Sequence, residues 1–150
     1  MSLKQQIDND IKSAMLAKNK EELEALRSIK SMILLAETDK GSTGQLAADV
    51  EGKILMKAAK QRKESADIFL EQSRKDLADR ELFQLEVINR YLPKQLSEEE
   101  LTTELKGLIA EIGAKGPQDM GKVMGLATKK LAGKADGKMI SEIVKKLLNP

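Results

Sequence analysis

Residues 119–148 read DMGKVMGLATKKLAGKADGKMISEIVKKLL, and this stretch predicts two short amphipathic helices joined by a bend. The bend is Gly133-Lys134-Ala135-Asp136-Gly137. Apolar residues recur at helical spacing on both sides of it, so one arc of each helix is predicted to be buried. These residues are Met120, Val123, Met124, Ala127 and Leu131 before the bend, and Met139, Ile140, Ile143, Val144 and Leu147 after it.

Lysines point away from both apolar arcs. Lys122 and Lys129 lie seven residues apart in the first helix, and Lys138 and Lys145 repeat that spacing in the second. Lys122 and Lys138 are close to the predicted helix N-termini, where N–H groups and the helix dipole favour an anion. The pattern predicts a phosphate-binding surface, with glycines that allow close approach. Its residues are Lys122, Lys129, Lys130, Lys134, Lys138, Lys145, Gly121, Gly125, Gly133 and Gly137.

The charge of the chain is unevenly distributed. Residues 1–112 hold 18 Lys and Arg against 21 Asp and Glu, whereas residues 113–150 hold 8 against 3. Such asymmetry indicates an anionic partner for the basic part. The alternative is that these lysines only keep a small domain soluble.

Gly121 and Gly125 both lie inside the first of the two helices, opposite its apolar arc and next to Thr128. Each glycine in a helix interior costs about 1 kcal/mol relative to alanine. We therefore expect something to approach this bare face closely. An RNA backbone and the N-terminal part of the chain are equally good candidates.

The whole chain is predicted to be all-α, because helix-forming residues dominate and no strand-like alternation is present. Four helices in residues 1–92 predict a four-helix bundle. Pro93 ends the fourth helix, and residues 93–97 are the predicted hinge. Residues 98–150 then form a smaller three-helix domain.

Capping residues predict where several helices begin and end. Ser2 with Gln5, Asn19 with Glu22 and Ser97 with Glu100 are N-terminal caps. Asp136 is expected to cap the last helix, Gly113 to end the fifth, and Pro117 to open the sixth. Residues 38–44 are a predicted loop, and residues 73–76 are a predicted break.

The third helix is predicted to run from about Gln45 to about Gln72, with Leu46, Val50, Ile54, Ile68 and Phe69 on its buried stripe. Lys57, Gln61 and Ser65 interrupt that stripe. Either the helix overshoots its partners, or it bears a second basic patch, Lys57, Lys60, Arg62 and Lys63. The acids Glu64, Asp67 and Glu71 can neutralise this patch as i,i+4 pairs. In the fourth helix, Leu82, Leu85, Ile88 and Leu92 are expected to point inward.

Composition excludes several kinds of chemistry. The chain has no cysteine and no histidine, which removes disulfides, thiolate metal sites and Ser-His or Cys-His nucleophile pairs. Runs of carboxylates such as Glu98-Glu99-Glu100 are typical of solvated helix N-termini rather than of catalytic pairs. We expect no metal, no cofactor and no membrane span. Because Met1-Ser2-Leu3-Lys4 leads directly into an amphipathic helix, we also expect no signal peptide and a cytoplasmic location.

The side chains available favour structured RNA over other nucleic acids. Phe69, Phe83 and Tyr91 all lie outside the basic stretch, so it lacks the aromatic platforms on which single-stranded bases stack. The cations there are all lysine, whereas base readout relies on Arg, Asn and Gln. Contacts to phosphates and 2′-hydroxyls fit this set better.

Gly121-Lys122-Val123-Met124 and Gly133-Lys134-Ala135-Asp136-Gly137-Lys138 are similar to the C-terminal tail of the GatB subunit of tRNA-dependent amidotransferases. Over its whole length the chain resembles the free-standing relatives of that tail, the YqeY-like proteins. Strings that match this family are residues 26–30, 60–65, 91–97 and 119–124. The resemblance implies a four-helix bundle joined to a three-helix domain. It also implies tRNA recognition, since the amidotransferase tail helps recognise tRNA, and a family-level label of carbon–nitrogen ligase with glutamine as amido donor.

Three hypotheses follow. The chain is a tRNA- or RNA-binding module, an accessory protein that docks on amidotransferase or another translation factor, or an amidotransferase-type enzyme. The catalytic centres of amidotransferases lie in other domains, and no sequence string here resembles them. The first hypothesis is the main prediction.

Overall fold

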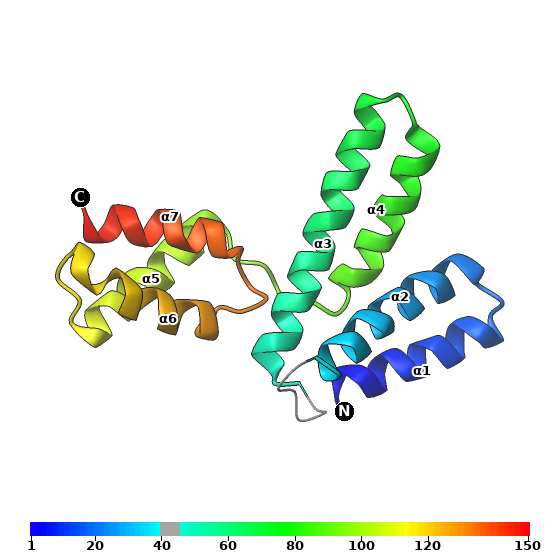
Figure 1. Ribbon diagram of the computed structural model, residues 1–150, viewed down its shortest axis with the longest axis horizontal. Helices are drawn as coiled ribbons and strands as arrows, with labels where there is room; N and C mark the ends of the chain where they lie inside the picture. The colour runs from blue at the N-terminus through cyan, green and yellow to red at the C-terminus, as the bar shows by residue number, and fades with distance from the viewer. Residues whose placement is uncertain (40–45) are drawn as a thin grey trace. The chain divides into compact units, whose positions relative to one another are not determined.

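The computed structural model describes residues 1–39 and 46–150. Every regular element in these ranges is a helix, which confirms the all-α prediction (Figure 1). The predicted loop over residues 38–44 lies mostly outside the described ranges, and so does the predicted helix start near Gln45. The elements are α1 (Leu3–Leu16), α2 (Lys20–Glu37), α3 (Ala48–Glu71), α4 (Lys75–Asn89), α5 (Glu98–Ile112), the 3-10 helix η1 (Pro117–Asp119), α6 (Met120–Lys130) and α7 (Gly137–Leu148).

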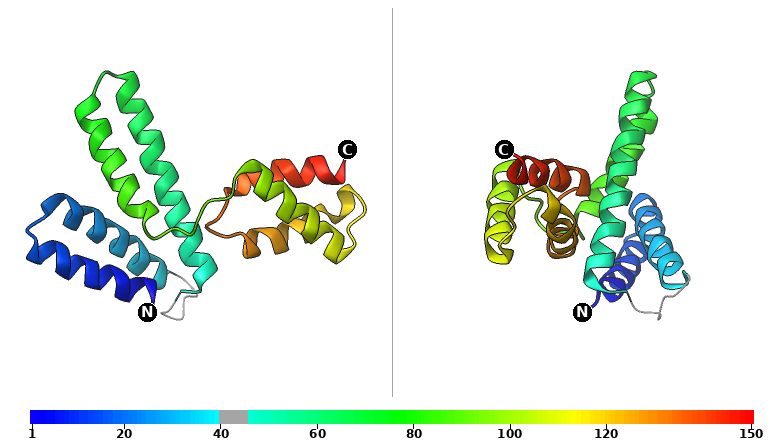
Figure 2. Two further views of the ribbon diagram at one scale, coloured as in Figure 1. Left: turned by 180° about the vertical axis from the view of Figure 1, so that it is seen from behind. Right: turned by 60° about the vertical axis from the view of Figure 1, so that its left-hand side comes forward.

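These helices group into two compact units, Met1–Leu92 and Pro93–Pro150. The first unit consists of two antiparallel hairpins, α1–α2 and α3–α4 (Figures 1 and 2). Helix α2 contacts both helices of the second hairpin. The division of the chain into a four-helix bundle and a three-helix domain that each fold independently stays a prediction.

Both hairpins of the first unit turn through a residue in the left-handed conformation, Lys18 at φ 56° and Ser73 at φ 58°. In each case an amide reaches back across the turn. Asn19 N donates to the carbonyl of Ala14 at 3.0 Å, and Arg74 N donates to that of Phe69 at 2.8 Å. Such bonds satisfy the last carbonyls of a helix and end it. The second turn confirms the predicted break at residues 73–76.

The apolar stripe predicted along α3 is wrong in part: Leu46 packs against the core of the first unit as predicted, but Val50 is 38% exposed. Gly52, Leu55, Ala58 and Ala66 form the buried side of α3, whereas the predicted core residue Ile68 is 52% exposed. The same error affects Leu82 of α4, which is 39% exposed while the smaller Ala78 is fully buried, whereas Ile88 is buried and Leu92 packs against the core as predicted. The prediction followed the bulkiest apolar residues. Small residues are buried instead, because they let two long helices pack closely side by side.

Polar side chains connect the helices of the first unit. Arg62 on α3 donates to Glu81 on α4 at 3.0 Å and to the hydroxyl of Ser28 on α2 at 3.4 Å. The Tyr91 hydroxyl donates to Asp10 on α1. Burial, together with the Asp10 carboxylate, raises the pKa of the Tyr91 hydroxyl, so it stays protonated as a donor. These contacts join segments that are far apart in the sequence.

The second unit is built from α5, α6 and α7 around one core. Its buried residues are Leu101, Leu105, Leu108, Val123, Ala127, Leu131, Ala135, Ile140, Ile143, Val144 and Leu148. Ser97 accepts from Glu100 N at 3.1 Å and caps α5, and Gly113 ends α5 at φ 69°, as predicted. Pro117 opens η1 rather than α6, and η1 runs directly into α6. This unit holds the predicted lysine surface.

Candidate nucleic-acid interface

The six lysines predicted to bind phosphate lie on the outer sides of α6, α7 and the bend between them. Helices α6 and α7 pack on each other, and both pack on α5. Val123 and Ala127 of α6 and Ile140 and Val144 of α7 are turned into the core. We define the lysine surface as six exposed lysines outside this core: Lys122, Lys129, Lys130, Lys134, Lys138 and Lys145.

On α6, helical geometry groups Lys122 and Lys129 with Gly121 and Gly125 on the face opposite the core. A methyl group built at Gly121 or Gly125 meets no atom within 4 Å beyond its sequence neighbours and its own helix backbone. Leu126 lies beside them and is 44% exposed. Within the second unit, this face is bare, and it combines two cations with an apolar side chain.

On α7, Lys138 and Lys145 are exposed on the side opposite the core, together with Glu142. Glu142 is four residues after Lys138 and three before Lys145, so its carboxylate shares their face. The sequence prediction missed this acid, although the i,i+4 spacing is visible in the chain. The predicted burial of Met139 is also wrong, because its side chain is 40% exposed. The outer face of α7 is therefore less uniformly basic than that of α6.

The ion pairs of the structure leave the lysine surface untouched. All six ion pairs found within the described residues lie in the first unit, for example Lys4 with Glu37 at 3.0 Å and Arg90 with Glu22 at 2.5 Å. Of the residues described, no acid lies within ion-pair distance of the six surface lysines. Their ammonium groups are therefore solvated and available to an external anion.

The N-termini of α6 and α7 offer less attraction for an anion than predicted. Helix α6 continues from η1, and Met120 N already donates to the carbonyl of Pro117, so α6 has no free N-terminal turn. At α7 the Asp136 carboxylate caps the helix as predicted and accepts from Lys138 N at 3.4 Å. An acid at that position opposes a second anion. Attraction for phosphate would come from the lysine side chains themselves.

The bend between the helices contains a glycine in the left-handed conformation and a hydrogen bond of its own. Gly133 has φ 79°, which favours glycine, and it is buried. Lys134 N donates to the carbonyl of Leu131 at 2.9 Å. The side chain of Lys134 is exposed, so a fixed backbone presents it to solvent between α6 and α7.

The second basic patch is partly engaged by acids. Lys57 and Lys60 are exposed on α3 without an ion pair among the described residues. Lys63 pairs with Asp67 at 3.4 Å, in the i,i+4 manner expected. Arg62 points instead toward α2 and α4, where it binds Glu81 and Ser28. Lys57 and Lys60 alone keep free charge in this patch.

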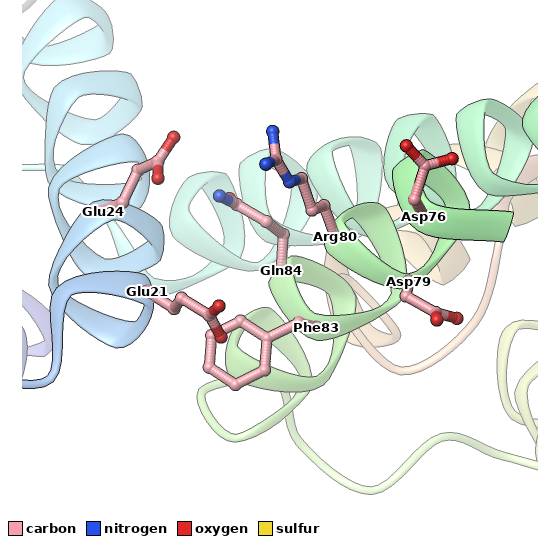
Figure 3. A pocket seen from close by; sticks show the side chains of 7 residues that line it. All are labelled: Glu21, Glu24, Asp76, Asp79, Arg80, Phe83 and Gln84. Atoms are coloured by element: carbon pink, nitrogen blue, oxygen red, sulfur yellow. The ribbon is translucent and has the colours of Figure 1, made fainter. Parts of the chain in front are cut away.

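A cavity of about 460 Å³ lies between α2 and α4 in the first unit. Figure 3 shows Glu21 and Glu24 facing it from α2, with Asp76, Asp79, Arg80 and Phe83 on α4. Hydrogen bonds from Arg74 hold the pKa of Asp76 below its usual range, so this carboxyl stays ionised. Across residues 1–39 and 46–150, no three His, Cys, Asp or Glu side chains gather as a metal site.

None of the helices in the described ranges is long and apolar enough to cross a membrane. The expected cytoplasmic location stays a prediction.

Comparison with known protein families matches residues 4–148 to the family described as Yqey-like protein. The match covers nearly the whole chain. The chain belongs to the YqeY-like family. The resemblance inferred from the sequence strings is thereby confirmed for the family itself.

A curated relative of this YqeY-like chain is Altered inheritance of mitochondria protein 41, mitochondrial, from Clavispora lusitaniae (strain ATCC 42720). The two are 38% identical over 107 residues, which cover 70% of this chain and 61% of the relative. The aligned region therefore spans less than two thirds of the relative's length. The name of that protein refers to mitochondrial inheritance.

Proposed function

We propose that this chain is an RNA-binding module that grips structured RNA, tRNA in the first place, through the lysine surface. The observation that supports this proposal most is the contrast between the two units. Six lysines and arginines of the first unit pair with acids, whereas the six surface lysines of the second are exposed and have no ion pair among the described residues. Solvated ammonium groups on adjoining helices can replace the counterions of a phosphate backbone.

The shape of the surface supports a backbone-directed mode of binding. The bare face at Gly121 and Gly125 leaves room for close approach, and lysine acts as a point charge that contacts phosphates without a fixed geometry. Contacts of this kind position a protein on RNA but do not read its bases. The proposal is therefore recognition of RNA shape.

The test is tRNA binding in a salt titration with two matched triple variants. In the first variant Lys122, Lys138 and Lys145 become Gln. In the control variant Lys53, Lys75 and Lys106, which are exposed and lie outside the lysine surface, become Gln. Both change the net charge equally. We expect the first variant to reduce the slope of log affinity against log salt by about two, and the control to leave it nearly unchanged.

If both variants reduced the salt slope equally, only the net charge of the protein would matter for binding. If the unaltered chain did not bind tRNA at low salt, the proposal would be excluded.

One observation favours a second candidate, an accessory protein that docks on a translation factor or amidotransferase. Leu126 adds an exposed apolar side chain to the bare glycine face of α6. Under this alternative, nuclease treatment leaves a co-purifying protein in place, and Leu126→Ala releases it while the lysine variants do not. Glutamine-dependent carbon–nitrogen ligation, which the resemblance to amidotransferases implies, is checked by assaying the purified chain for glutamine hydrolysis.

A further inference from the structure

The segment that follows Leu92 is bound to the bend that presents Lys134. Gln95 Nε2 donates to the carbonyl of Gly133 at 2.6 Å and to that of Pro93 at 3.0 Å. Leu96 N donates to the carbonyl of Lys134 at 2.9 Å. Two successive carbonyls of the bend are thus held by two successive residues from a distant part of the chain.

These bonds are not part of any helix. The bend lies between the end of α6 at Lys130 and the start of α7 at Gly137, so helical hydrogen bonds do not use the carbonyls of Gly133 and Lys134. The Leu96 side chain packs against the core of the second unit and anchors the segment. The Gln95 side chain is the outermost part of the clamp, since the residue itself is exposed.

We infer that Gln95 is a positioning residue for Lys134 in the proposed RNA interface, on which this inference rests. Its amide restrains the bend before RNA arrives. Less conformational entropy is then lost when Lys134 contacts a phosphate. Gln95 bears no charge and touches the lysine surface only through backbone, so its effect on binding passes through Lys134.

A double-mutant cycle tests this. Gln95→Met keeps the length of the side chain and removes the amide donor. It is measured for binding of unfractionated tRNA in three backgrounds: the unaltered chain, Lys134→Gln, and Lys145→Gln as the matched control. We expect Gln95→Met to weaken binding about three- to tenfold in the unaltered and Lys145→Gln backgrounds, as the cost of ordering a loosened bend and its side chain on binding predicts. In the Lys134→Gln background the same change should have less than about a twofold effect.

Hydrogen exchange without RNA provides a second measurement. In the Gln95→Met chain, the backbone amides of residues 133–136 should exchange faster, while those in the middle of α5 remain protected. A merely structural role would accelerate exchange throughout the second unit and weaken binding equally in every background, which would overturn the inference. Unchanged tRNA binding by Gln95→Met would overturn it as well. Failure of the unaltered chain to bind tRNA is a different result, because it removes the proposed function together with this inference.

Discussion

At the scale of single residues, Glu51 in the first turn of α3 has an unfavourable environment. Partial burial, and after it the nearby Glu37 carboxylate, raises the pKa of Glu51 above its ordinary value of 4.5. Glu37 is itself paired with Lys4 at 3.0 Å. The folded protein therefore holds the Glu51 proton more tightly than the unfolded chain does. Its ionised form reduces stability as the pH rises through the range above 4.5.

We predict that Glu51→Gln stabilises the protein at neutral pH. The gain should stay below about 1 kcal/mol, because the group is largely solvated. It should disappear below the ordinary pKa of glutamate, where Glu51 is protonated in both states. Thermal unfolding of both chains across pH measures the difference. A gain that persists in acid would mean that charge at Glu51 is not its cause.

At the scale of elements, substituting the glycines inside helices can distinguish effects on stability from effects on binding. Gly107 in α5 and Gly121 and Gly125 in α6 all have open space where a methyl group would lie. None of the three needs a left-handed backbone, in contrast to Gly113 at φ 69°. Their only structural effect on the free protein is therefore the low helix propensity of glycine.

We predict that Gly107→Ala, Gly121→Ala and Gly125→Ala each stabilise the second unit by roughly 0.5–1 kcal/mol. If a partner approaches the bare face of α6, the two α6 variants should also bind tRNA more weakly, whereas Gly107→Ala should bind normally. Urea unfolding and tRNA titration measure the two effects. Normal binding by all three variants would place the RNA away from this face.

At the scale of the whole molecule, each unit has a hydrophobic core of its own. The lysine surface and the segment that clamps its bend both lie within Pro93–Pro150. The proposed binding activity therefore belongs to the second unit.

We predict that residues 93–150 expressed alone fold into helices and bind tRNA with the salt slope of the full chain. Residues 1–92 alone should bind much more weakly, since their 16 Lys and Arg are balanced by 16 Asp and Glu, and six of these cations pair with acids. Circular dichroism and the salt titration check these two outcomes. Equal slopes for both fragments would point to the exposed Lys57 and Lys60 as additional contacts.

The sequence by itself determined that the protein is helical, where most helices begin and end, and which lysines lie outside the second core. These properties depend on the spacing of apolar residues and on caps such as Ser97, Gly113 and Asp136, whose partners are close in the chain. Only the tertiary structure decided which side of α3 is buried, that Arg62 binds Glu81, and that Gln95 holds the bend at Gly133. Each of these depends on how segments distant in sequence pack together, and neither helical period nor composition contains that information.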